Sequence, residues 1–423
     1  MPKKYRYDLG HYAFQNGRIG SLMTLSTIPL IAGDVMSIDL AGIFRLSPLR
    51  RNLTVDARVD IFGFYVPYRQ IYGQSWIDFM KEGIDEAQTF SGDALGTESY
   101  SALGGFHIGT RAAWLLRGYN RIWNRYFRHP TDDSGIRADT ATFAAGNARK
   151  YGIACAHMPS IWNTPIDAEV DSSDLEVSTA GDVLDLTELA QQKARLKTER
   201  RREFFSQRYN DVMRREYGTS VNIDADERPL LIMRSSQWMS GYDVDGTGDA
   251  TLGQYAGKSA TLVRFRMPRR MFSEHGTLWI MALVRFPPIH NREMHYLAKK
   301  ANPTFQEISG QPDVMANEPP GVVDLDDYFG DSTGHVADAG IAPFGQWYRH
   351  HPNSVHRDYH TLQGFTFLSG LLTTKDLARY VDSNAYDTVF QTTQLGHWQC
   401  QSRIEVDAER CVPPVEASIF AGT

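Results

Sequence analysis

Seven consecutive apolar residues occupy positions 278–284, in a segment that continues to Phe286 and stops at Pro287 and Pro288. A short apolar run bounded by prolines is typical of a strand that is buried on both faces. The run is far too short to cross a membrane as a helix. It therefore predicts a central strand of a β-sheet in a soluble protein.

Alternation of apolar and polar residues predicts further strands at 56–67, 261–267 and 403–409. Strands so far apart in the chain, with long insertions between them, are typical of a β-sandwich and not of βαβ alternation. The patterns predict seven core residues, which are Val59, Ile61, Val263, Phe265, Ile280, Ala282 and Val284.

The composition is that of an ordinary globular protein, with 42% hydrophobic and 22% charged residues in 423. Three cysteines, Cys155, Cys400 and Cys411, with no CxxC spacing, exclude a disulfide scaffold and a cysteine zinc module. They indicate synthesis in a reducing cytoplasm. A basic N-terminus with no apolar stretch after it predicts that there is no signal peptide.

No internal repeat and no linker rich in Pro, Gly or Ser divides the chain, so we predict one domain over 1–423. The large insertions are expected at about 85–220 and 290–380. The net charge of −6 argues against a dedicated nucleic-acid-binding protein. An acidic stretch is followed by a strongly basic one, and we expect 182–218 to form an exposed helix that docks on another subunit or on a scaffold protein.

Arginines and aromatic residues gather in a segment without any acid, at 106–130, where the sequence predicts a helix over about 111–127. Phosphates pair with guanidinium groups and unpaired bases stack on aromatic rings, so this composition suits single-stranded nucleic acid. An amphipathic surface helix whose arginines extend over its own aromatic rings is the alternative. The candidate contact residues on this helix are Arg117, Arg121, Arg125, Arg128, Trp123 and Phe127.

A second pair of candidates for nucleic-acid contact is Arg264 and Arg266, because a strand would place both on one face.

No complete catalytic motif is present, and two clusters contain metal-binding residue types without the spacing of a known site. His350, His351, His356 and His360 could bind a transition metal, but a solvated surface turn is the favoured interpretation. Carboxylates in a second cluster could bind Ca²⁺, although the EF-hand spacing is missing and a plain turn is again favoured. These carboxylates are Asp243, Asp245 and Asp249. No cofactor is required, and a structural divalent cation is the only addition considered.

Long strings of residues, in the same order over most of the chain, are similar to the major capsid protein of the microviruses, which are small icosahedral bacteriophages with single-stranded DNA genomes. The strings are 27–34 (TIPLIAGD), 45–51 (RLSPLRR), 59–67 (VDIFGFYVP), 72–81 (YGQSWIDFMK), 224–231 (DADERPLL), 240–247 (SGYDVDGT), 274–277 (EHGT), 282–288 (ALVRFPP) and 345–349 (GQWYR).

The resemblance implies an eight-stranded antiparallel jelly roll with long loop and helical insertions. It implies a structural protein, not an enzyme, of which sixty copies close a small icosahedral shell around a circular single-stranded DNA genome. The implied partners are copies of itself, a spike protein, a small basic DNA-binding protein, scaffolding proteins during assembly and the genome, with no membrane. The implied location is the virion, after synthesis in the bacterial host cytoplasm.

Jelly rolls also occur in lectins and cupins, so a carbohydrate-binding or carbohydrate-active protein is the alternative. Its candidate carboxylate pair is Asp326 and Asp327.

Overall fold

A computed structural model gives the architecture of the chain. The structure describes residues 4–50, 53–73, 75–76, 94–98, 109–112, 114–128, 228–245, 255–272, 274–287, 289–312, 315, 321–330, 334–335, 340–342, 344–349, 351–357, 373, 383–410, 412 and 414. The predicted helix at 182–218 lies outside these residues, as do Cys155 and Cys411.

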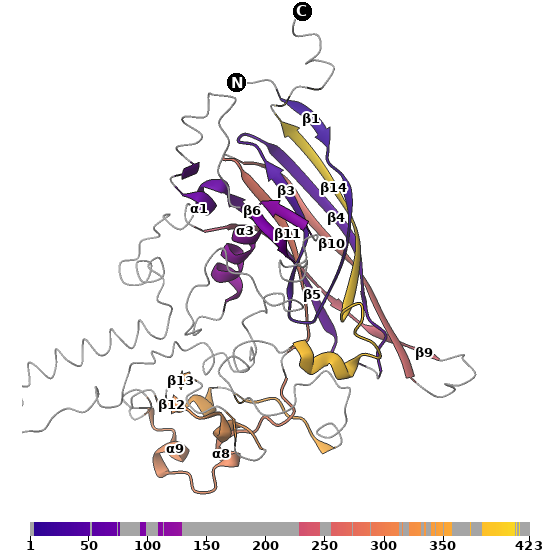
Figure 1. Ribbon diagram of the computed structural model, residues 1–423. Helices are drawn as coiled ribbons and strands as arrows, with labels where there is room; N and C mark the ends of the chain where they lie inside the picture. The colour runs from indigo at the N-terminus through magenta and orange to yellow at the C-terminus, as the bar shows by residue number, and fades with distance from the viewer. Residues whose placement is uncertain are drawn as a thin grey trace, which may run out of the picture.

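Two antiparallel sheets pack face to face and form most of the described molecule (Figure 1). The first sheet has the strand order β1-β14-β4-β10-β9, with β2 also paired to β14, and the second has the order β3-β11-β5-β8. The strands are β1 (Tyr5–Asp8), β2 (His11–Gly17), β3 (Leu22–Leu30), β4 (Val35–Leu46), β5 (Ala57–Pro67), β8 (Leu230–Met239), β9 (Gly241–Asp245), β10 (Tyr255–Met271), β11 (Gly276–Arg285) and β14 (Trp398–Arg410).

Eight strand positions result when β1 and β2 are counted as one edge strand, because both pair with the same side of β14. Strand β9 extends β8 past Ser240 and crosses to the first sheet, where it pairs with the beginning of β10. Four strands per sheet, joined in this order, form the jelly roll. The predicted fold class is confirmed.

All seven predicted core residues are buried between the sheets. On β10, Val263 and Phe265 point into this core and alternate with exposed arginines, as the sequence pattern predicted. Strand β11 lies between β3 and β5 and is buried on both faces from Gly276 to Val284. The prediction of a central strand there is also confirmed.

A second hydrophobic cluster covers the outer face of the β3-β11-β5-β8 sheet. Helix α3 (Trp114–Ile122) and the π-helical turn η2 (Trp123–Phe127) pack there against Phe62, Phe64 and Trp279. Gly118 permits the close approach, because a Cβ at this position would lie 2.6 Å from the Trp279 ring. Strand β5 is therefore buried on both faces, although its sequence alternates like that of a half-buried strand.

The helix predicted at 111–127 begins later than expected. Residues Gly109–Ala112 form strand β7, which pairs with β6 (Ala94–Glu98), so Arg111 lies opposite Leu95 and not in a helical turn. Strand pairing here overrides the helical pattern of the sequence. At the other end, Arg128 has an extended backbone and leaves the helix, so it does not continue the face of Arg117 and Arg121.

Residues between β11 and β14 form short elements beyond one end of the sandwich (Figure 1). They include α8 (Tyr296–Lys299), α9 (Phe305–Ser309), β12 (Gly321–Val323), η4 (Leu325–Tyr328), β13 (Gly340–Ala342), η5 (Gln346–Tyr348) and η7 (Ser383–Val389). The remaining helix, α1 (Tyr68–Tyr72), follows β5 directly. None of the helices in the described part of the chain has the length and hydropathy needed to cross a bilayer.

Candidate nucleic-acid interface

The arginine face, as we call Arg117 and Arg121 of α3 and Arg125 of η2, lies on the helix that covers the second sheet, and Arg128 follows directly after η2. The helix is held by its buried aromatic residues and by two hydroxyl groups. Tyr119 donates a hydrogen bond to the carbonyl of Leu22 (2.7 Å), and Tyr126 donates one to the carbonyl of Pro229 (2.5 Å). All four arginines are half-buried. The segment thus presents positive charge on a firmly attached support.

The structure buries Trp123 and Phe127, the two aromatic residues that the sequence offers for base stacking. Their exposed fractions are only 3% and 4%, and both rings belong to the second hydrophobic cluster. Phe127 packs edge-on against Phe62, with ring centroids 5.2 Å apart. Burial of apolar surface against the sheet explains why these rings face inward, away from any base.

Arg117 fits the alternative interpretation of the helix in part. Its guanidinium carbon lies 5.4 Å from the ring centroid of Tyr72, a cation–π distance. The aromatic ring belongs to α1 and not to the same helix, so the arginine also connects two elements.

A second group of charged residues, which sequence reasoning missed, lies beside the helix on the same outer sheet face. In the register of this sheet, Arg58 of β5 lies opposite Arg285 of β11 on one side and Trp238 of β8 on the other. Two residues further along β5, Asp60 lies opposite Ser236 of β8. We call the group the Asp60 cluster; it contains Arg58, Asp60, Arg234, Ser236, Trp238 and Arg285.

Asp60 is the buried centre of this cluster, with a side chain that is only 1% exposed. Its carboxylate forms ion pairs with Arg285 (2.9 Å), Arg58 (3.2 Å) and Arg234 (3.3 Å) and accepts a short hydrogen bond from Ser236. Burial alone would raise the pKa of Asp60, but the hydrogen bond and the three guanidinium groups outweigh it, so the pKa lies below its usual value. One carboxylate therefore fixes three arginines and leaves the cluster with a net positive charge.

Trp238 is the exposed aromatic residue of the cluster, with 56% of its surface accessible. The guanidinium of Arg58 lies over its ring, 5.8 Å from the centroid. The side chains of Arg58 and Arg234 are 33% and 44% exposed, so both retain access to solvent. An exposed indole between solvated arginines has the chemistry that the buried Trp123 lacks.

Buried ring contacts connect the Asp60 cluster with the helix of the arginine face. Arg234 lies 5.3 Å from the ring of Phe62, and the same ring contacts Phe127, the residue before Arg128. The sequence signal for the cluster was the placing of Arg234, Ser236 and Trp238 at alternate positions of one segment. Their position opposite Arg58 and Asp60 follows only from the strand pairing.

Arg264 and Arg266 lie on the opposite side of the sandwich. Both are exposed on the outer face of the first sheet, because Phe265 between them points into the core. Arg266 lies next to Asp39 in the register, and Asp39 lies next to Glu405. This face therefore exposes both signs of charge, whereas the acid of the Asp60 cluster is buried.

The structure describes only some of the candidate metal ligands that the sequence offers. Asp243 and Asp245 lie two residues apart on β9, in a strand and not in the plain turn that was favoured, while Asp249 lies outside the described residues. His351 and His356 are exposed, and His350 and His360 also lie outside. Among the described residues, no group of three or more His, Cys, Asp or Glu side chains is placed to hold a metal ion.

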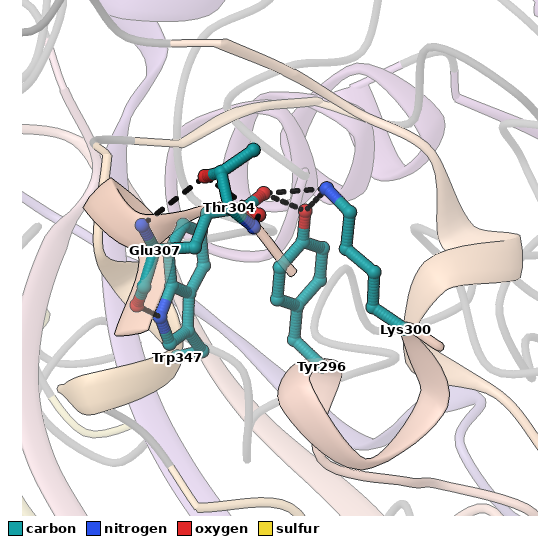
Figure 2. Close-up of polar contacts among 5 residues, drawn as sticks. All are labelled: Tyr296, Lys300, Thr304, Glu307 and Trp347. Carbon is teal, nitrogen blue, oxygen red and sulfur yellow. Dashed lines mark hydrogen bonds and ion pairs between the residues drawn. The ribbon is translucent and has the colours of Figure 1, made fainter. Parts of the chain in front are cut away.

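A polar network around Glu307 holds the region beyond the end of the sandwich (Figure 2). Its carboxylate accepts hydrogen bonds from Lys300 (2.5 Å), Tyr296 (2.7 Å) and the backbone of Thr304 (2.6 Å). Burial would raise the pKa of Glu307, but these bonds lower it to about 2. Thr304 completes a capping box at the start of α9, and Trp347 donates to the carbonyl of Glu307 (3.2 Å) and stacks on Tyr296. Every carboxylate oxygen is engaged, so the network is structural.

The carboxylate pair proposed for a carbohydrate site also has a structural role. Asp326 accepts hydrogen bonds from the backbone amides of Gly334 and His335, at distances of 2.9–3.2 Å. Both oxygens of the Asp326 carboxylate are therefore engaged by the backbone. This geometry does not favour the carbohydrate alternative.

The two-sheet jelly roll is an architecture of viral capsid proteins, and one outer face of this one carries an exposed tryptophan among arginines. Comparison with known proteins agrees. The family described as "Capsid protein (F protein)" matches residues 2–179 and 170–420. Capsid protein F of Escherichia phage G4 is 41% identical over 421 residues, which cover 98% of this chain and 97% of that protein. Capsid protein F of Enterobacteria phage phiK is 38% identical over 425 residues, covering 98% and 96%.

The chain belongs to the capsid protein F family of the microviruses. It is a structural shell protein of a bacteriophage virion and not an enzyme, so the carbohydrate-active alternative is overturned.

Proposed function

We propose that sixty copies of this chain form a closed icosahedral shell around a circular single-stranded DNA genome. The observation that carries the proposal is the match to capsid protein F over nearly the whole chain. Exposed apolar side chains support contacts between copies, since three of them lie in a row across four neighbouring strands of the first sheet. These side chains are Phe14 on β2, Ile43 on β4 and Leu262 on β10, with Gln401 of β14 between the first two.

The further proposed partners are a spike protein, scaffolding proteins during assembly and a small basic DNA-binding protein. A net charge of −6 is consistent with a separate basic protein that neutralises most of the genome phosphates. The shell needs no cofactor in this proposal.

Particle size tests the shell directly. We expect particles purified from cells that produce the phage to sediment in the megadalton range, with the 47.8 kDa chain as their main protein. A reconstruction should contain sixty copies related by icosahedral symmetry. Recovery of the chain only as a compact monomer or dimer outside such particles would contradict the proposal.

The outer face of the second sheet is the one that we propose to face the genome. The helix that carries the arginine face contains no acid, and the only acid of the adjoining cluster is the buried Asp60. On the first sheet, Arg264 and Arg266 lie near the carboxylates of Asp39 and Glu405. These two carboxylates repel phosphates. Net positive charge favours the second sheet as the binding face for a polyanion.

Substitution of the arginine face by glutamine tests this orientation. Each phosphate contact that is lost should lower the slope of log Kd against log salt by about 0.7, with little dependence on base sequence. The measurement is fluorescence anisotropy of a labelled poly-dT oligonucleotide with the purified chain. The variant with Arg264→Gln and Arg266→Gln is the control and should keep the wild-type slope. A loss of slope in that control alone would assign the genome to the first sheet.

A further inference from the structure

We propose that the Asp60 cluster is a nucleotide-binding site for single-stranded DNA, in which Trp238 stacks on one unpaired base while Arg58 and Arg234 contact the adjoining phosphates. The inference rests on the proposed genome contact and gives it a defined site. It replaces the two buried aromatic residues, Trp123 and Phe127, by one that a base can reach.

The arrangement of the side chains carries the first step. Arg58 and Trp238 occupy directly opposite positions on neighbouring strands. When a base stacks on the indole, the phosphate of the same nucleotide is therefore within reach of the Arg58 guanidinium. The guanidinium of Arg58 lies over the ring of Trp238, and the exposed indole surface remains for a base. Aromatic stacking tolerates any base, as a contact with a packaged genome requires.

Asp60 carries the second step, because it fixes the arginines before DNA arrives. Arg58 and Arg234 are each bound to its carboxylate while their side chains remain 33% and 44% exposed. A guanidinium that is already positioned loses less conformational entropy when it binds a phosphate. Two further guanidinium charges in excess of the carboxylate leave the site complementary to a polyanion.

The helix of the arginine face carries the third step, because it packs on the same face of the sheet. Arg234 lies 5.3 Å from the ring of Phe62, and Phe62 packs against Phe127 of η2. The helix contains arginines and no acid, so it adds positive charge beside the stacking platform, a combination typical of non-specific single-strand binding.

The test compares Trp238→Ala, Trp238→Phe and wild type in binding of a labelled poly-dT oligonucleotide. We expect Trp238→Ala to weaken binding about tenfold or more, with an unchanged salt slope, since stacking involves no charge. Trp238→Phe keeps an aromatic face and should retain most of the affinity. Arg58→Gln with Arg234→Gln should instead lower the salt slope by about 0.7 per contact.

Phe14→Ala is the matched control, because Phe14 is an even more exposed aromatic residue on the opposite sheet. Wild-type affinity in Trp238→Ala, or an equal loss in Phe14→Ala, would overturn the site. So would a Trp238→Ala chain that binds DNA normally but forms no shell, because Trp238 would then contact another copy. Failure of the wild-type chain to bind poly-dT at all would contradict the genome contact as a whole, whereas the other results concern this site alone.

Discussion

Replacement of Ile61 by aspartate should abolish soluble protein. Ile61 is completely buried between the two sheets and pairs with Ala282 of β11 and Ser235 of β8. A carboxyl group at this position would have no partner among the apolar side chains of the core, and its burial together with the lost packing of Ile61 would cost much of the typical folding free energy of about 5–15 kcal/mol. The measurement is the amount of chain in the soluble and insoluble fractions after expression.

Ile61→Val is the matched control for that experiment. It removes one methylene group and should cost about 0.5–1.5 kcal/mol, which leaves the chain soluble. Normal shell assembly by Ile61→Asp would show that Ile61 does not face the core and that the register of β5 is wrong.

Asp60→Asn should lower the free energy of unfolding by about 3 kcal/mol at neutral pH, because it leaves three guanidinium groups without their shared carboxylate. The value is near the low end for a broken buried ion pair, since Arg58 and Arg234 are partly solvated. Urea unfolding of the unassembled chain measures the difference. Asp39→Asn, at an exposed carboxylate on the other sheet, should have little effect.

The difference between wild type and Asp60→Asn should also depend on pH. The pKa of Asp60 in the folded chain lies below the ordinary value of 3.8, so the unfolded chain binds the proton first as the pH falls. The stabilisation by Asp60 is thus complete above 3.8 and is lost as the pH falls toward the pKa of the folded state. A difference that stays constant between neutral pH and about pH 3 would contradict the assigned role.

The sequence was a good guide wherever burial follows from local alternation. Val263 and Phe265 face the core and Arg264 and Arg266 face solvent, because the side chains of a strand alternate whatever its neighbours are. The apolar run on β11 likewise predicted directly that this strand is buried on both faces. The covering of β5 by α3 could not be predicted in this way, because it brings Phe62 and Phe127 together across 65 positions of the chain.

The candidate site was predicted only in part, for a related reason. Aromatic residues beside arginines have the same sequence pattern whether their rings stack on DNA or on the protein, and only the position of the sheet places Trp123 inside. Trp238 has one arginine four residues before it on the same strand, but its closest partner, Arg58, is 180 positions away. The arginine face could be predicted because Arg117, Arg121 and Arg125 repeat at four-residue intervals along α3 and η2.

The position of β14 between the first strands and β4 determines when the first sheet can be completed during synthesis. Arg6 pairs with Asp407, which is 401 positions later, so the first strands have no partner until nearly the whole chain has left the ribosome. At typical translation rates of 5–20 residues per second this takes roughly 20–80 s. The first sheet is therefore completed after translation and not during it. Throughout that interval the edge of β4 that later receives β14 is open to pairing with other nascent chains.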